Sequence, residues 1–377
     1  MKIALYGGAF NPVHNEHINI VRAAAEELEL DKIIVIPTAI SPHKRTSMTA
    51  SGRDRLQMCR LAFSGVPNAE VSDYEIKRGG ISYSYVTCRH FKKLYKDDEL
   101  YFIIGADMLR IFEFWKEPEE ILKCVTLAVC AREDKNALGA DIKNFTKTFK
   151  KEIVAFSYVG KSVSSTRIRA LAALGEDTVK YVPESVRKYI KDKNLYALPE
   201  LRAVKKYLTQ ERWEHTVRVT EAAAEHARGA GVYEIDAITA AALHDCAKYL
   251  SENAEELSGF VPPKGVPAQV MHQFGGAYMA EKVFGIKDEN ILNAIRFHTT
   301  GRENMSRLEK LIFLADLLED GRNFDGINQL RKLFMQNIDD CMFVALAHQI
   351  EYLKTVGENI CPLTQRAYNY LKENYGK

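Results

Sequence analysis

Residues 2–17 read K-I-A-L-Y-G-G-A-F-N-P-V-H-N-E-H. Lys2–Tyr6 predicts a short buried strand, and the apolar periodicity after the turn predicts a helix that ends near Leu28. Gly7 and Gly8 have no Cβ, so the backbone of the turn can approach a ligand closely. The helix start offers unpaired N–H groups and a partial positive charge. The stretch therefore predicts a phosphate site after the first strand, and a tight strand–helix connection without a ligand is the alternative.

Two histidines lie at the start of this helix. His14 and His17 are three residues apart, so they can share one face of the first turn. With Gly7, Gly8 and Phe10 they complete the string G-G-x-F-x-P-x-H-x-x-H. This string resembles the opening motif of the nucleotidyltransferase superfamily, whose core is H-x-x-H or H-x-G-H. Histidines that are merely polar surface are the alternative.

Length and composition limit the class of protein. A chain of 377 residues suggests two or three domains. The net charge of +2 gives no reason to expect nucleic acid as a partner. Seven cysteines without C-x-x-C spacing indicate a reducing compartment. The sequence shows no signal segment and no apolar run of about eighteen residues, so we expect a cytoplasmic protein that does not bind a membrane.

Further apolar runs alternate with helical stretches. Ile33–Pro37, Glu99–Gly105 and Val125–Cys130 predict strands, and Ile153–Phe156 predicts a fifth. Such alternation is typical of a parallel sheet with helices on both faces. Ligands of these sheets bind beyond the carboxyl ends of the strands, where Gly7–His17 is expected to lie. We therefore predict an α/β, Rossmann-like domain.

A second phosphate signal lies at residues 163–169, V-S-S-T-R-I-R. Serines at a helix start cap it and leave N–H groups facing outward. Arg169 adds a guanidinium that can bind two phosphate oxygens. An ordinary capped helix is the alternative. The string resembles the I-S-S-T-x-I-R signature that closes the site of the same superfamily and holds the ATP tail.

The order of the motifs narrows this resemblance. After the opening string come S-P-H-K at 41–44, S-Y at 82–83, G-A-D at 105–107, W-K at 115–116 and the serine string. This order resembles bacterial nicotinate mononucleotide adenylyltransferases over about residues 1–196. The resemblance implies that the phosphate of nicotinate mononucleotide attacks the α-phosphorus of ATP. Pyrophosphate leaves, deamido-NAD forms, and Mg²⁺ bridges the phosphates.

The same resemblance implies roles for single residues. His14 and His17 would steady the charge at the α-phosphorus, and Lys44 would be a cation for either substrate. Ser164, Ser165 and Arg169 would hold the departing pyrophosphate. The other implied ATP-binding or substrate-binding residues are Gly7, Gly8, Phe10, Ser84 (where the family has threonine), Asp107, Trp115 and Thr166. Helix capping is the alternative for Asp107, and core packing is the alternative for Trp115.

Beyond Pro199 the alternation of strand and helix stops, and only helical periodicity remains. Tyr181–Asn194 predicts the last helix of the first domain, and Leu201–Gly231 predicts one long helix of the second. The predicted domains are therefore an α/β domain over residues 1–196 and an all-α domain over residues 200–377.

Six candidate metal ligands are spread over the predicted helices of the second domain: His215, His244, Asp245, His272, His298 and Asp316. Asp316 lies in the apolar run L-I-F-L-A-D-L-L, where a carboxylate must be paired or bound to a cation. Imidazole and carboxylate ligands in this number suit a metal centre. A structural role is the alternative for each residue taken alone.

The order H…HD…H…H…D resembles the HD phosphohydrolase superfamily, in particular the branch that splits diadenosine tetraphosphate into two ADP. The resemblance implies two metal ions, with iron as the expected metal. One ion would be held by His215, His244, Asp245 and Asp316, with Asp245 bridging, and the second by His272 and His298. Lys248 and Arg302 would steady a phosphate, and solvated charge is the alternative for both.

The sequence thus predicts a bifunctional enzyme that acts on ATP, nicotinate mononucleotide and diadenosine tetraphosphate. An HD module that senses a nucleotide and regulates the first domain is the main alternative, and an HD site for another nucleotide is a second. A scaffold without either activity is a third. The sequence leaves open the preference for the acid or the amide mononucleotide and the number of chains that assemble.

Overall fold

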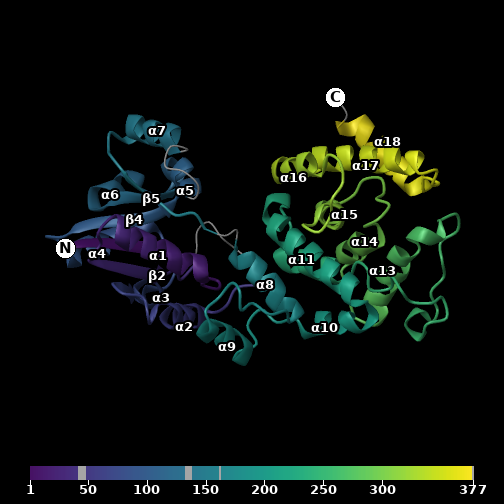
Figure 1. The fold of residues 1–377 in the computed structure, drawn as a ribbon, viewed down its shortest axis with the longest axis horizontal. Helices are drawn as coiled ribbons and strands as arrows, with labels where there is room; N and C mark the ends of the chain where they lie inside the picture. The colour runs from purple at the N-terminus through teal and green to yellow at the C-terminus, as the bar shows by residue number, and fades with distance from the viewer. Residues whose placement is uncertain (41–47, 132–137, 161–162, 376–377) are drawn as a thin grey trace. The chain divides into compact units, whose positions relative to one another are not determined.

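The computed structural model describes residues 1–40, 48–131, 138–160 and 163–375. The chain divides into two compact units, an α/β unit and a helical unit, both drawn in Figure 1. The second unit contains Tyr196–Lys377 and Arg169–Asp177, and the first contains most of the remaining residues. Within the described residues, no helix is both long and apolar enough to cross a membrane.

The first unit is built on one parallel sheet with the strand order β3-β2-β1-β4-β5-β6. The strands are β1 (Lys2–Gly8), β2 (Lys32–Pro37), β3 (Ala69–Val71), β4 (Glu99–Gly105), β5 (Thr126–Ala131) and β6 (Val154–Ser157). The predicted α/β class and parallel sheet are confirmed. The edge strand β3 has no counterpart among the predicted strands, because A-E-V is too short to show a periodicity.

The strands are connected by α1 (Asn15–Glu27), α2 (Gly52–Phe63), α3 (Tyr74–Arg78), α4 (Ser84–Leu94), α5 (Ala106–Arg110), α6 (Pro118–Cys124) and α7 (Gly139–Phe149). Two further helices, α8 (Ser165–Leu174) and α9 (Glu184–Asp192), follow the last strand. The core between sheet and helices is apolar, with Leu5, Phe112 and Leu127 fully buried. Burying each such side chain contributes about 1.5–3 kcal/mol. This packing fixes the strand ends that bear the motifs.

β1 lies in the middle of the sheet and pairs with both β2 and β4. The chain adds β2 and β3 on one side of β1 and then β4, β5 and β6 on the other side. Connections leave the carboxyl ends of β1 and β4 in different directions, and a ligand crevice forms at such a point. Gly8 ends β1 here, and a Cβ on it would lie 2.9 Å from Cζ of Phe10. Glycine is therefore required for the ring of Phe10 to pack against this turn.

The second unit consists of helices: α10 (Pro199–Arg202), a 3₁₀ turn (Ala203–Tyr207), α11 (Gln210–Ala230), α12 (Glu234–Leu243), α13 (His272–Lys282), α14 (Glu289–Arg296), α15 (Arg307–Leu318), α16 (Ile327–Gln336), α17 (Ile338–Thr355) and α18 (Pro362–Tyr375), with short 3₁₀ turns at Glu255–Leu257 and Ala268–Val270. The predicted single helix over Leu201–Gly231 is wrong. Thr209 starts a new helix, because its hydroxyl accepts the N–H of Arg212.

Candidate functional site

The two histidines of the first motif lie together at the start of α1. The backbone N–H of His14 donates to Nδ1 of His17 at 3.1 Å, and the two rings stack with centroids 3.7 Å apart. The ring of Phe10 meets His17 edge-on at 5.0 Å. Since Nδ1 of His17 is an acceptor, the proton of a neutral ring lies on Nε2. In the neutral ring of His17, Nε2 is therefore the donor.

The second phosphate motif lies against the first. The hydroxyl of Ser165 donates to the carbonyl of Pro12 at 2.9 Å. Ser164 caps α8, because its hydroxyl accepts the N–H of Arg167 at 3.0 Å, and Thr166 lies in the first turn. The start of α8 and the loop before α1 are thus joined by this hydrogen bond, and the triphosphate site that the two motifs predict stays a prediction.

Arg169 lies one turn after Ser165 in α8 and has a partner in the helical unit. Its guanidinium is buried in the second unit, where Nε and Nη2 donate to the two carboxylate oxygens of Glu234 at 2.7 and 2.6 Å. A bidentate pair of this kind uses the face of the guanidinium that phosphate oxygens would need. Its predicted role in holding pyrophosphate stays a prediction, and Glu234 would compete with the ligand.

The other predicted residues of the first domain have mixed surroundings. Asp107 is exposed in the first turn of α5, and Ser84 is the half-buried first residue of α4. Trp115 packs beside Phe102 and Phe112, with ring centroids 6.2 and 5.3 Å away, and its predicted contact with the substrate stays a prediction. Lys44 lies outside the described residues.

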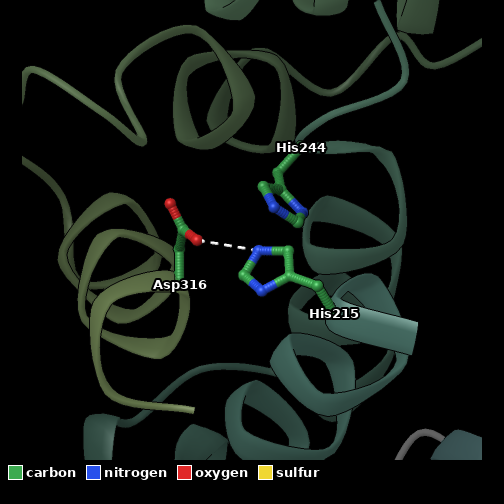
Figure 2. A group of neighbouring side chains, drawn as sticks. All are labelled: His215, His244 and Asp316. Atoms are coloured by element: carbon green, nitrogen blue, oxygen red, sulfur yellow. Dashed lines mark ion pairs between the residues drawn. The ribbon is translucent and has the colours of Figure 1, made fainter. Parts of the chain in front are cut away.

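The predicted metal ligands of the second unit converge. His215, His244 and Asp316 form one group whose ligand atoms lie within 4.8 Å of one another, and His244, Asp245 and His298 form a second. Figure 2 shows the first group, with side chains from α11, the end of α12 and α15 pointing toward one another. His272 joins the second group through its Nε2, which lies 3.3 Å from Oδ1 of Asp245. All six predicted ligands therefore lie in one buried cluster.

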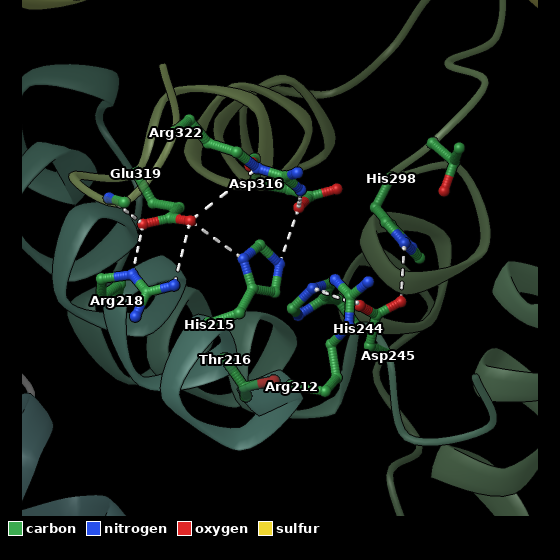
Figure 3. A network of polar contacts seen from close by, with 12 residues as sticks. Arg212, His215, Thr216, Arg218, His244, Asp245, His298, Asp316, Glu319 and Arg322 are labelled. Carbon is green, nitrogen blue, oxygen red and sulfur yellow. Dashed lines mark hydrogen bonds and ion pairs between the residues drawn. The ribbon is translucent and has the colours of Figure 1, made fainter. Parts of the chain in front are cut away.

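The imidazoles are held by their outer nitrogens. Nδ1 of His244 lies 2.6 Å from the carbonyl of Ala241, Nδ1 of His298 lies 2.8 Å from that of Ile295, and Nδ1 of His215 lies 3.1 Å from Oε1 of Glu319 (Figure 3). When Nδ1 donates, the lone pair of a neutral ring lies on Nε2. These partners therefore direct three Nε2 atoms into the cluster, as metal ligation requires.

The charges of the cluster also suit a cation. Burial raises the pKa of Asp316, but the contact with His215 and the nearby imidazoles outweigh burial and hold the pKa below its ordinary value. Burial likewise opposes ionisation of Asp245, and His244, His272 and His298 lower its pKa well below the usual range. Nε2 of His215 lies 2.9 Å from Oδ1 of Asp316. A lone pair and a carboxylate at this distance need a proton or a metal ion between them.

Several cations surround the cluster. Nζ of Lys248 lies 3.0 Å from Nε2 of His272 and 3.9 Å from Asp245, and its predicted role beside a phosphate stays a prediction. Arg212, which the sequence analysis did not identify, lies 3.0 Å from Oδ2 of Asp245 (Figure 3). It precedes His215 by three residues, so helical spacing could have revealed it.

Arg302 has a structural partner. Its guanidinium donates to both carboxylate oxygens of Glu309 at 2.6 and 3.0 Å, and Glu309 closes the capping box of α15 with Ser306. Its predicted role in binding phosphate stays a prediction. The pair instead anchors the start of the helix that presents Asp316.

Comparisons with known proteins agree with both halves. A cytidylyltransferase-like family model matches residues 5–171, and an HD domain model matches residues 212–321. A probable nicotinate-nucleotide adenylyltransferase/Ap4A hydrolase of Mycoplasma genitalium is 31% identical over 92% of this chain and 97% of its own length. A probable nicotinate-nucleotide adenylyltransferase of Clostridium tetani is 36% identical over 52% of this chain and 98% of its own length.

One solved structure, described as a predicted HD superfamily hydrolase involved in NAD metabolism from Clostridium acetobutylicum, is 32% identical. It covers 46% of this chain and 96% of its own, with a TM-score of 0.44.

Fold and site together define a nucleotidyltransferase-type α/β unit followed by an HD-type helical unit. The similarity to the Mycoplasma protein extends over both units and therefore identifies one family of fused proteins. The chain belongs to the family of fused nicotinate-nucleotide adenylyltransferase/Ap4A hydrolases.

Proposed function

We propose that this chain is a bifunctional enzyme. Its first unit transfers AMP from ATP to nicotinate mononucleotide, which yields deamido-NAD and pyrophosphate. Its second unit hydrolyses diadenosine tetraphosphate to two ADP. The convergence of the six predicted ligands in one buried cluster is the observation that most strongly supports an active second unit, and the two names joined in its full-length relatives support the pairing of activities.

The first reaction needs alignment and charge stabilisation more than covalent chemistry. The positive ends of the dipoles of α1 and α8 would stabilise the negative charge of the phosphates. Nε2 of His17 is directed to donate to an oxygen of the reacting phosphate. Ser164 and Ser165 would orient the pyrophosphate, which their position beside the first motif supports, and Mg²⁺ would neutralise charge on ATP when bound.

In the second unit, His215, His244, Asp245, His272, His298 and Asp316 would hold the metal ions, and their imidazole and carboxylate chemistry fits iron or another first-row metal. Bound metal supplies hydroxide from water and stabilises developing charge. Lys248 and Arg212 border the cluster with positive charge. These side chains can hold phosphate oxygens of a dinucleotide while Glu319 keeps His215 oriented.

Paired substitutions test the two-site assignment. We expect His17→Ala to abolish deamido-NAD formation and to leave hydrolysis of diadenosine tetraphosphate unchanged. We expect His244→Ala to abolish this hydrolysis and to leave deamido-NAD formation unchanged, because His17 belongs to the first unit and His244 to the second. Products are identified by mass after incubation with each substrate set. Loss of both activities in either folded variant would contradict the assignment.

A regulatory HD module is the second candidate, because Arg212 and Arg322 each lie 3.0 Å from a carboxylate of the cluster and can balance its charge without metal. Metal analysis of protein purified without added metal separates the two. Metal near or above one ion per chain supports the hydrolase, and protein that retains no metal and cleaves no dinucleotide supports the sensor.

A further inference from the structure

Arg55 is a buried cation in the α/β unit, and it lies outside both phosphate motifs. It lies in the first turn of α2 and is 3% exposed. Each of its three guanidinium nitrogens donates to a backbone carbonyl: Nη1 to Ala9 at 2.7 Å, Nη2 to Ala39 at 3.0 Å and Nε to Ala50 at 3.2 Å. A planar guanidinium can make three such bonds at fixed angles, which a lysine ammonium cannot match.

The three carbonyls come from two loops that follow the neighbouring strands β1 and β2. Ala9 follows β1 in the first phosphate motif, and Ala39 and Ala50 lie near the two ends of the loop between β2 and α2. Further bonds tie the same segments: the N–H of Ala50 donates to Oδ1 of Asn11 at 3.0 Å, and the N–H of Ala39 donates to the hydroxyl of Ser82 at 2.9 Å. Arg55 is therefore the common partner of the backbone around the predicted triphosphate site.

The bond to Ala9 has a geometric consequence. The C=O and N–H of a trans peptide point in opposite directions, so a carbonyl of Ala9 fixed toward Arg55 turns the N–H of Phe10 to the other side. Phe10 also has a φ of 46°, a left-handed conformation that a bulky residue keeps only where its surroundings hold it. Arg55 thus holds the peptide plane between Ala9 and Phe10, which precedes His14 and His17 in the same motif. Its positive charge lies on the side of this plane that the carbonyl of Ala9 faces.

We propose that Arg55 is a positioning residue for adenylyl transfer. It does not touch the substrates. It fixes the loop that would bind the reacting phosphate, and its positive charge would stabilise the negative charge that builds up at this phosphate in the transition state. This inference rests on the adenylyl transfer proposed above.

The test measures kcat and KM separately. For Arg55→Met we expect kcat per folded site to fall about 10²-fold, the effect of a displacement near 1 Å, with KM for ATP changed less than about threefold because most ground-state contacts remain. Arg55→Lys keeps the charge but loses the three bonds, so its kcat should lie between those of Arg55→Met and the wild type. Arg53→Met, which removes an exposed charge from the same helix, is the matched control and should match the wild type.

Chemical rescue separates positioning from mere stability. Millimolar guanidinium should restore part of the kcat of Arg55→Ala, since it can occupy the cavity left beside the three carbonyls. Folded sites are counted by binding of an ATP analogue, and hydrolysis by the second unit reports on the rest of the chain. A kcat per folded site equal to that of the wild type in both Arg55→Lys and Arg55→Met would overturn the inference. A wild-type protein without adenylyl transfer would instead overturn the proposed function.

Discussion

Replacing Glu319 by glutamine tests whether one carboxylate sets the affinity of the second unit for metal. Glu319 is 2% exposed, and it accepts from Arg218 Nε at 2.6 Å and from the N–H of Gly321, besides its contact with His215 at 3.1 Å. Glutamine has one acceptor oxygen, which Arg218 and Gly321 would use. Its NH₂ group would then face Nδ1 of His215 and favour the tautomer with the proton on Nε2.

That tautomer removes the lone pair that a metal ion needs. Loss of an outer-shell partner of this kind typically lowers metal affinity 10–100-fold, which corresponds to about 1.4–2.7 kcal/mol. Mn²⁺ affinity can be measured by titration against a chelator of known affinity. Asp320→Asn is the matched control, because it removes one negative charge at the adjacent exposed position.

We expect the control to bind Mn²⁺ like the wild type and to retain its hydrolase activity. A folded Glu319→Gln protein with wild-type Mn²⁺ affinity would refute the argument that Glu319 orients His215. A loss of equal size in both variants would show that net charge, and not the tautomer, sets the affinity.

Three further predictions concern metal, pH and the core. Chelation should abolish hydrolysis, while adenylyl transfer should return with Mg²⁺ alone; hydrolysis that survives metal-free dialysis would contradict the metal assignment. Burial raises the pKa of Glu75 despite the bonds from Ser82 and Thr87, so its contribution to stability is full below about pH 4.5 and is lost as pH rises through the raised pKa. Glu75→Gln should therefore gain stability relative to the wild type between pH 4.5 and 7 in urea melts; parallel curves would refute this. Phe156→Ala, at a fully buried site, should cost about 3–5 kcal/mol in the same assay, and a loss below about 1 kcal/mol would show that β6 is not part of the core.

The sequence was sufficient to predict features that depend on local chemistry. Parallel strands buried on both faces are continuous apolar runs, so β1, β2, β4 and β5 were recognisable. Asp316 stood out because a carboxylate in an apolar helix needs a cation. The structure brings it within 2.9 Å of His215, as the predicted metal centre requires.

Features that depend on distant partners were not accessible. Arg169 has the sequence context of a phosphate ligand, and only the fold reveals Glu234, 65 positions further along the chain, as its partner. In the sequence Arg55 resembles any surface arginine of an amphipathic helix, and only the fold brings the carbonyls of two loops to it. Trp115 illustrates the same limit, since periodicity does not distinguish a ring that stacks on a ligand from one that packs in the core.

The bond between Ser165 and Pro12 joins positions 153 residues apart. During synthesis the first motif leaves the ribosome long before its partner exists, and at about 5–20 residues per second the delay is roughly 8–30 s. Throughout that interval the newborn chain has only the first of the two motifs of the proposed triphosphate site. Catalysis by the amino-terminal unit can therefore begin only when translation of that unit is almost finished.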